Sequence, residues 1–302
     1  MVPERFAQRI VEVHGADGVA WLRRLPTIIA DCEQRWSLRI GAPFAPLSYN
    51  YAAPGVRTDG TAVVLKVGVP HPELMSEIES LRLYAGDGIV RLLQFDCNQG
   101  ALLLERAMPG TSLAELGDDE AATSIAAQLM RQLWRPVPPE HIFPSVAKWA
   151  AGLQRLRAQF DGTTGPFPRA LVEQAETLFT QLLSAKVAPV LLHGDLHHEN
   201  ILAAERDPWL AIDPKGLVGD PGYEVGAFLH NQLPDPVAGA KARAILQRRV
   251  DQFGEELGFE RARVRDWGLA LAVLSAWWTY EDHGYVGEEA LACAEVLATV
   301  KV

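Results

Sequence analysis

The sequence at residues 193–200 is His193-Gly194-Asp195-Leu196-His197-His198-Glu199-Asn200, and Trp209-Leu210-Ala211-Ile212-Asp213 follows closely. The apolar run at 190–192 precedes the first stretch, and Ile201 and Leu202 continue from it. Short apolar runs bounded by turn-forming residues are typical of buried strands. The sequence therefore predicts three short strands, with polar loops at their ends.

The spacing of Asp195, Asn200 and Asp213 predicts a site for phosphoryl transfer. Moving a γ-phosphoryl group to a hydroxyl needs an oriented acceptor and metal ions on the phosphates, with little covalent chemistry from the protein. In kinase-type sites an Asp accepts the acceptor's proton, an Asn five residues later binds one Mg²⁺, and an Asp after a short strand binds metal too. We therefore assign Asp195 as the base, and Asn200 and Asp213 as Mg²⁺ ligands beside ATP.

These residues have two other interpretations, as turn or strand-end residues and as part of a zinc site. Asp and Asn are common in turns and at strand ends, but this triple spacing rarely arises by chance. His193, His197 and His198 lie close together and could bind zinc, yet there is no H-E-x-x-H and no nearby cysteine, and oxygen ligands favour magnesium. His197 and His198 are instead expected to shape the loop, and His198 to contact the substrate.

Composition places the chain among ordinary globular proteins. It has 302 residues, 48% of them hydrophobic and 22% charged, which excludes a disordered or fibrous class. A formal charge of −10 argues against a nucleic-acid partner. The three cysteines are widely spaced, no signal peptide is recognisable, and the most apolar segment, 267–280, is too short for a membrane span. We expect a cytoplasmic protein, either a monomer or a homodimer.

The character of the chain changes near Ala107-Met108-Pro109-Gly110. Before it, we expect two helical pieces within 3–38 bent at Pro26, and a small antiparallel sheet. After it, the periodicity is mostly helical, so the domains are predicted as 1–107 and 108–302. The predicted strands are 47–51, 62–67, 89–95 and 101–105, and the predicted helices are 72–86, 119–134, 143–160, 168–185, 236–257, 261–283 and 287–300.

A nucleotide site is predicted in the first part of the chain. Lys66 ends an apolar strand, where a cation is needed for the α- and β-phosphates, and Glu77 in the next helix is expected to hold it. Each residue has a plainer interpretation, as a solvated strand end and as helix surface. Further nucleotide contacts are expected from a phosphate loop without G-x-G-x-x-G and from a hinge facing adenine, at Ser48, Asn50, Glu105 and Ala107.

Several motifs resemble the aminoglycoside and hydroxyurea antibiotic-resistance kinase family, with its streptomycin-phosphorylating members as the nearest group. The resemblance runs from about Trp21 to the C-terminus. It is carried by residues 193–201, by Trp209-Leu210-Ala211-Ile212-Asp213-Pro214-Lys215-Gly216-Leu217-Val218-Gly219, by Gly88-Ile89-Val90-Arg91-Leu92-Leu93, and by Leu274-Ser275-Ala276-Trp277.

This resemblance implies an α+β, protein-kinase-like bilobal fold, with a small antiparallel-sheet N-lobe and a mostly helical C-lobe. It also implies ATP and Mg²⁺ as cofactors and a small, cationic aminoglycoside as substrate. The motifs depart from those of eukaryotic protein kinases, because Gly194 replaces the Arg of H-R-D and Asp213-Pro214-Lys215 replaces D-F-G. No A-P-E follows, so peptide substrates are not expected.

Substrate contacts are expected in the helices after Asp213. Carboxylates pair bidentately with guanidinium groups, and an aromatic wall would complete such a site. The residues expected there are Glu224, Asp235, Trp277, Glu281 and Asp282, although acidic helix ends are usually solvated and aromatic stripes usually belong to the core. A kinase for hydroxyurea or another metabolite, a catalytically silent nucleotide-binding regulator and a protein kinase remain alternatives, as does GTP in place of ATP.

Overall fold

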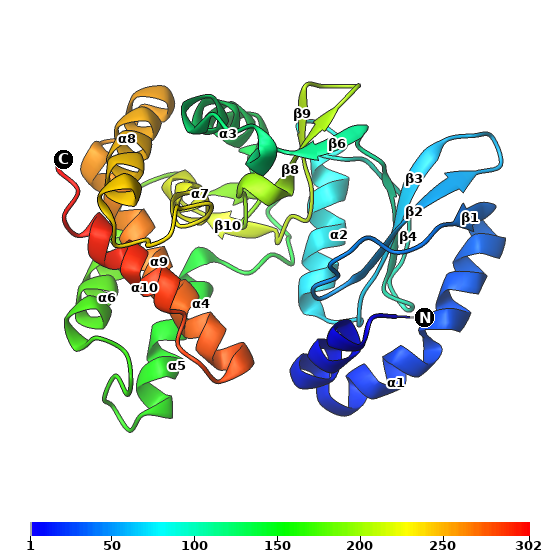
Figure 1. Ribbon diagram of the computed structural model, residues 1–302, viewed down its shortest axis with the longest axis horizontal. Helices are drawn as coiled ribbons and strands as arrows, with labels where there is room; N and C mark the ends of the chain where they lie inside the picture. The colour runs from blue at the N-terminus through cyan, green and yellow to red at the C-terminus, as the bar shows by residue number, and fades with distance from the viewer. Residues whose placement is uncertain (1) are drawn as a thin grey trace. The chain divides into compact units, whose positions relative to one another are not determined.

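The computed structural model describes residues 2–302, which form two compact units divided between Gly110 and Thr111. Each unit has its own β-structure and its own buried core. The first is built on an antiparallel sheet with two helices, and the second is mostly helical (Figure 1).

The first unit contains a five-stranded antiparallel sheet in the order β1-β2-β3-β5-β4. Four of the six residues of β3 are buried, including its last three, and all of β5 except its last residue is buried, so these two strands form the centre of the sheet. The strands are β1 (Leu38–Ile40), β2 (Tyr51–Arg57), β3 (Ala62–Val67), β4 (Leu92–Asp96) and β5 (Ala101–Glu105).

Strand β2 lies where the sequence did not predict it. The prediction of a strand at 47–51 was wrong, because the chain bends there and pairs with β3 only from Tyr51 onward. Pro54 and Gly55 are both unfavourable in strands, and Pro54 cannot donate a hydrogen bond. Its carbonyl accepts from Gly41 N–H at 2.8 Å, so the position of its missing N–H faces the short edge strand and leaves the β3 ladder intact.

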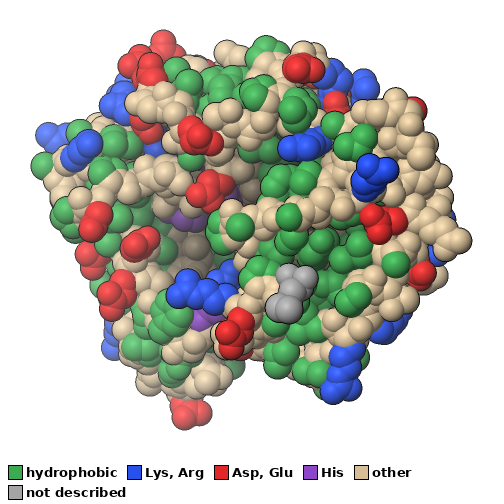
Figure 2. All heavy atoms as spheres, turned by 45° about the vertical axis from the view of Figure 1, so that its right-hand side comes forward, with side chains coloured by type: hydrophobic (Ala, Val, Ile, Leu, Met, Phe, Trp, Pro, Cys, Tyr) green, Lys and Arg blue, Asp and Glu red, His purple; other side chains and the backbone are tan. Residues whose placement is uncertain are grey.

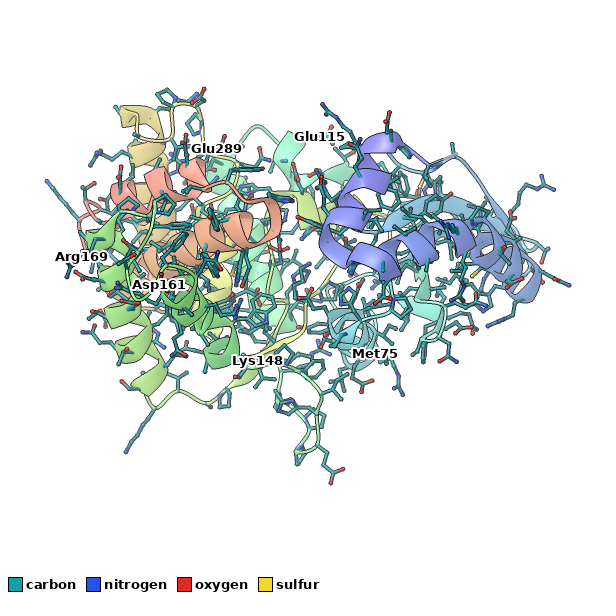
Figure 3. All side chains as sticks on the ribbon, turned by 90° about the horizontal axis from the view of Figure 1, so that it is seen from below. Met75, Glu115, Lys148, Asp161, Arg169 and Glu289 are labelled. Atoms are coloured by element: carbon teal, nitrogen blue, oxygen red, sulfur yellow. The ribbon has the colours of Figure 1, made fainter. Side chains whose placement is uncertain are left out.

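Two helices complete the first unit. Helix α1 (Glu4–Trp36) is interrupted at Gly15, whose φ of 53° and ψ of −127° are not helical, so its two pieces join there and not at Pro26. Helix α2 (Pro72–Tyr84), marked by Met75 in Figure 3, buries Leu74, Ile78 and Leu81. It ends at Ala85, which has φ of 51°, one residue before the glycine expected to stop it.

The second unit is organised around α9 (Arg261–His283), which is buried over most of its central length. The single helix predicted at 143–160 is divided into two, because the chain breaks at Ala151. The other predicted helices are present within a few residues of their expected ends. The helices are α3 (Asp119–Leu133), α4 (Val146–Ala150), α5 (Gly152–Gln159), α6 (Arg169–Ser184), α7 (Val225–Leu229), α8 (Ala240–Leu257) and α10 (Glu288–Leu297), with short 3₁₀ turns η1 (Leu113–Glu115), η2 (His198–Asn200) and η3 (Pro221–Glu224).

Small sheets carry the loops of interest in the second unit. Strand β7 (Val190–Leu192) pairs with β10 (Leu217–Gly219), and β8 (Ile201–Ala204) pairs with β9 (Trp209–Ala211) as an antiparallel hairpin. The short strand β6 (Pro109–Ser112) completes the second of these sheets in the order β6-β8-β9.

The surface carries charges of both signs. On the face drawn in Figure 2, acidic and basic side chains are interspersed, and no continuous basic patch is visible there. None of the helices within residues 2–302 combines the length and the apolar character that a membrane span needs.

Candidate active site

The loop that carries Asp195 starts directly from the β7–β10 pair. The backbone pairing continues one step beyond the strands, since His193 O accepts from Lys215 N–H at 2.7 Å and from Gly216 N–H at 3.2 Å. The two loops that follow β7 and precede β10 therefore begin side by side. This brings the segment of Asp195 next to the segment of Asp213.

The buried imidazole of His193 ties these two segments together. Its Nε2 lies 2.7 Å from Ile212 O, and its Nδ1 lies 3.3 Å from Asp195 N. A carbonyl only accepts and an amide N–H only donates, so these contacts assign a neutral ring protonated at Nε2. Burial lowers the pKa of His193 to about 3, which keeps the ring in this form.

Asn200 and Asp213 lie at the base of the same hairpin. Ile201 pairs with Ala211, and Ile212 N–H donates to Asn200 O at 2.9 Å, so the next residue along is Asp213. Asn200 Nδ2 donates to Asp195 O at 2.9 Å, which leaves the amide oxygen for a cation. An amide oxygen and a carboxylate are hard donors that suit Mg²⁺, whose remaining positions are commonly filled by phosphate and water.

Two backbone conformations shape these loops. Gly194 has φ of +87°, and a Cβ at this position would lie 2.9 Å from Leu217 Cδ1. The Arg of an H-R-D motif therefore does not fit this backbone, which explains the glycine. Asp213 has φ of +59°, an unusual value for a residue other than glycine, and strained residues of this kind are concentrated at functional sites.

The prediction that Glu224 contacts substrate was wrong. Its side chain is only 1% exposed, and its carboxylate accepts from His193 N–H and Gly194 N–H, both at 2.8 Å. Burial raises the pKa of Glu224 to about 7, while the N–H groups of Gly194 and His193 oppose this rise. Glu224 thus holds the backbone of the loop through the N–H groups of the two residues before Asp195.

Two other predicted substrate contacts are also corrected, and a third stays a prediction. His198 is 3% exposed and stacks on Phe228, with ring centroids 3.8 Å apart. Trp277 is 3% exposed and packs among aromatic rings that include Tyr280. Glu281 is exposed and binds a guanidinium of the chain itself, since Arg155 donates to both of its carboxylate oxygens at 2.6 and 2.9 Å, and its role as a substrate contact stays a prediction.

Two further predicted substrate residues, like Glu281, lie in exposed positions. Asp235 lies in the loop between α7 and α8, and Asp282 lies in the last turn of α9. Both stay predictions as contacts for a cationic ligand. Two residues without a predicted role in catalysis also contact this loop. His193, weighed in the sequence only as a zinc ligand, donates its backbone N–H to Glu224, and the buried Arg249 of α8, which the sequence did not single out, contacts His198.

In the first unit, Lys66 and Glu77 form an ion pair. Lys66 Nζ lies 2.7 Å from Glu77 Oε1, and the two residues are 4% and 7% exposed. Lys66 lies in β3 and pairs across the sheet with Ala52 and Leu102, while Glu77 comes from the second turn of α2. The carboxylate therefore holds the ammonium in one direction, which is the geometry that the sequence predicted.

The other expected nucleotide contacts lie around the same sheet. Ser48 is exposed just before β2, and Asn50 Oδ1 lies so close to Gly68 that a Cβ at that glycine would overlap it. Glu105 ends β5, and its side chain accepts from Arg91 N–H at 3.0 Å. Ala107 is 9% exposed. The nucleotide roles of Ser48, Asn50, Glu105 and Ala107 stay predictions.

Glu77→Gln is expected to raise the KM for ATP by roughly tenfold, the equivalent of about 1.4 kcal/mol, because the ammonium of Lys66 loses its charged partner. Initial-rate kinetics at varied ATP would measure the change. Glu79→Gln is a matched control, since Glu79 lies on the same helix and pairs with the exposed Arg82. Equal KM values in the two variants would contradict the role of the pair.

The sheet unit with its buried Lys–Glu pair and the helical unit with its Asp-Asn-Asp loops define the class as a protein-kinase-like α+β fold. A solved structure supports this: aminoglycoside phosphotransferase APH(4)-Ia, in a ternary complex with ADP and hygromycin B, matches with a TM-score of 0.62. The match covers 89% of this chain and 97% of that chain at 15% identity. At this identity the likeness establishes the fold.

Sequence comparison is more specific. The family model described as aminoglycoside/hydroxyurea antibiotic resistance kinase matches residues 49–283. The streptomycin 6-kinase of Streptomyces glaucescens is 34% identical over 93% of this chain and 91% of its own length. The hydroxyurea phosphotransferase of Kitasatospora aureofaciens is 36% identical over 98% of this chain and 85% of its own length. The chain belongs to the aminoglycoside/hydroxyurea antibiotic resistance kinase family.

Proposed function

We propose that this protein transfers the γ-phosphoryl group of ATP to a hydroxyl of a small molecule. The observation that carries the proposal is the geometry at the base of the β8–β9 hairpin. There Ile212 N–H donates to Asn200 O, so Asp213 is the residue next to the partner of Asn200, and Asn200 Nδ2 donates to Asp195 O at 2.9 Å. An oxygen donor pair next to a loop carboxylate is the arrangement that phosphoryl transfer requires. The ADP in the ternary complex of the related fold supports a nucleotide as co-substrate.

The residues have separate tasks in this mechanism. Mg²⁺, held by Asn200 and Asp213, would neutralise charge on the phosphates. Asp195, whose side chain is 38% exposed, orients the acceptor hydroxyl and takes its proton. Lys66, directed by Glu77, binds phosphate oxygens, so residues 1–107 serve as the nucleotide lobe and 108–302 as the catalytic and substrate lobe.

Streptomycin is the substrate that we propose. The support is the 34% identity to a streptomycin 6-kinase across nearly the whole chain. Asp235 and Asp282 are the exposed carboxylates proposed for its cationic groups, with the acidic net charge of −10 favouring such a ligand. Hydroxyurea is the second candidate, because a hydroxyurea phosphotransferase is 36% identical over 98% of the chain.

A coupled ADP-release assay would test the proposed activity. The purified protein is offered Mg·ATP with streptomycin, a second aminoglycoside and hydroxyurea in parallel, and mass spectrometry locates the added phosphate. We expect streptomycin-dependent ADP release and a monophosphorylated product. ADP release with hydroxyurea alone would replace streptomycin by the second candidate, whereas ATP binding without turnover on any acceptor would favour a silent regulator.

A further inference from the structure

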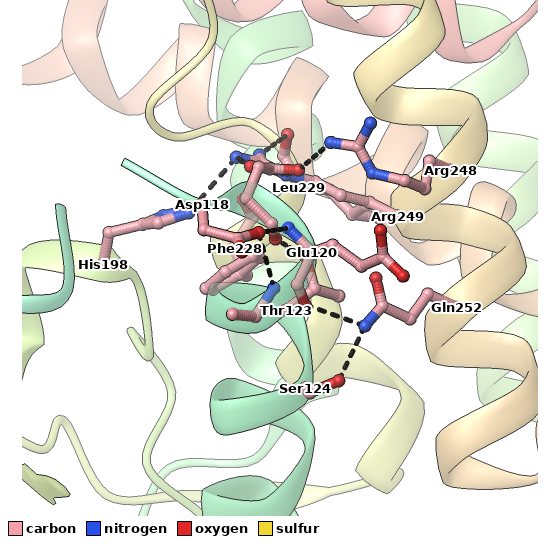
Figure 4. Close-up of polar contacts among 12 residues, drawn as sticks. Asp118, Glu120, Thr123, Ser124, His198, Phe228, Leu229, Arg248, Arg249 and Gln252 are labelled. Atoms are coloured by element: carbon pink, nitrogen blue, oxygen red, sulfur yellow. Dashed lines mark hydrogen bonds and ion pairs between the residues drawn. The ribbon is translucent and has the colours of Figure 1, made fainter. Parts of the chain in front are cut away.

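We propose that the buried Arg249 and His198, together with the partly buried Asp119, form a positioning unit that sets the metal-binding end of the 195–200 loop. The three residues come from α3, α8 and η2, which are far apart in the sequence. The inference rests on the proposed function, because it assigns the unit a task in the metal-dependent step. Figure 4 shows the guanidinium of Arg249 at the centre of these contacts.

Arg249 is fully buried, and each of the three nitrogens of its guanidinium has at least one hydrogen-bond acceptor. Nε and Nη2 donate to Asp119 Oδ1 at 3.0 and 2.5 Å, and Nη2 also lies 3.2 Å from His198 Nε2. Nη1 donates to the carbonyls that end α7, at 3.0 Å to Phe228 O and 2.8 Å to Asn231 O. A buried charge is stable only when it is paired and hydrogen-bonded in this way.

These contacts determine the state of the His198 ring. Arginine only donates, so His198 Nε2 is an acceptor and the ring is neutral with its proton on Nδ1. Phe228 stacks on this ring at 3.8 Å, and the guanidinium carbon of Arg249 lies 5.0 Å from the centroid of the same phenyl ring. The imidazole is therefore held by stacking on one side and by a charge-assisted hydrogen bond at its edge.

His198 passes this restraint to the loop. It is the first residue of η2 (His198–Asn200), and its carbonyl accepts from Ser112 Oγ at 3.1 Å. Asn200 is the last residue of the same turn and donates to Asp195 O. A shift of the His198 ring would therefore move the turn that ends in the proposed metal ligand.

Stability alone does not account for this arrangement. Replacing a buried ion pair by well-packed apolar residues is often neutral or stabilising, so a pair of this kind is weak evidence for a purely stabilising role. Here the pair also directs one donor at a side chain in the turn of Asn200. Outer groups that orient a metal ligand commonly change metal affinity or activity by about 10- to 100-fold when removed.

Two substitutions of His198 separate positioning from packing. His198→Phe keeps a ring to stack on Phe228 but removes the acceptor for Arg249, whereas His198→Gln places an amide oxygen near the position of Nε2. Mn²⁺ binding to the full-length protein with ADP is measured by electron paramagnetic resonance, together with the thermal midpoint and kcat. We expect H198F to weaken Mn²⁺ binding about tenfold and H198Q to stay within about twofold of wild type.

A third variant keeps the test decisive where H198F fails to fold. Asp119→Asn leaves His198 intact and weakens the anchor of Arg249, and we expect a severalfold loss of Mn²⁺ affinity. Equal Mn²⁺ affinity in wild type, H198F and D119N, with only the thermal midpoint lowered, would overturn the positioning role alone. Absence of Mn²⁺ binding in the wild type would overturn the metal site of the proposed function as well.

Discussion

Asp195→Asn is expected to lower kcat by roughly 10²- to 10⁴-fold, the usual contribution of a general base. Asparagine keeps the size and hydrogen-bonding shape of the side chain but cannot take the proton of the acceptor hydroxyl. The backbone of this residue is held through His193 Nδ1 and Asn200 Nδ2, and neither contact uses its carboxylate. The loop should therefore keep its structure, and the dissociation constant for ATP should stay within about twofold of wild type.

Rapid-quench or coupled ADP-release kinetics would measure kcat, and calorimetry would measure nucleotide binding. Asp207→Asn is the matched control, because Asp207 lies at the tip of the β8–β9 hairpin and pairs with its neighbour Arg206. Turnover in D195N at the rate of D207N would remove Asp195 from the role of base. A loss of ATP binding in D195N would mean that its carboxylate acts on the nucleotide instead.

Above pH 7, where the buried Glu224 is ionised, Glu224→Gln is expected to lower kcat by roughly 10²-fold while the protein remains folded. The carboxylate of Glu224 accepts hydrogen bonds from the N–H groups of His193 and Gly194. Glutamine has only one acceptor oxygen, so its NH₂ group would face one of these N–H donors without forming a hydrogen bond. The loop would shift, and a misplacement of about 1 Å at a catalytic group can cost about 10²-fold in rate. Circular dichroism would confirm the fold, and a kcat within a few-fold of wild type would contradict the anchoring role.

We expect the buried Glu224 to make the free energy of unfolding depend on pH. The pKa of Glu224 rises from 4.5 to about 7 on folding, so between these values the folded state binds more protons than the unfolded state. Its contribution to the free energy of unfolding is fully present below about pH 4.5 and is lost as pH rises through about 7, on the order of 3 kcal/mol in total. Denaturant unfolding of metal-free wild type and E224Q would measure it: the stability difference should shrink over this window, and a constant difference would contradict the shifted pKa.

The sequence predicted the fold best where local signals and tertiary packing agree. The strands 62–67 and 101–105 are apolar runs, and the helix 261–283 contains the most apolar segment of the chain between charged ends, so all three have the predicted bounds. The strand containing Pro54 was missed. A strand accommodates a proline only when the position of the missing N–H faces away from the neighbouring ladder that needs it, as it does here. That information is not local to the segment.

The residues of the candidate site also fall into two groups, those predicted from local spacing and those whose position depends on distant partners. The spacing of Asp195, Asn200 and Asp213 is a local signal, and the order of Lys66 and Glu77 was enough to predict their pairing. Glu224 was assigned to the substrate as a carboxylate after Asp213 that could pair with a guanidinium, and His198 as a histidine within the motif. Their burial follows from partners 31 and 51 residues away, and no spacing rule indicates those partners.

The β8–β9 hairpin has a consequence for how the protein tolerates change. Both proposed cation ligands sit at the open end of one ladder, and the tip around Arg206 and Asp207 lies at the other end. Insertions or deletions at the tip should therefore leave the ligand geometry intact. A slip of the ladder by a single residue, in contrast, would turn one ligand to the opposite face and abolish chelation.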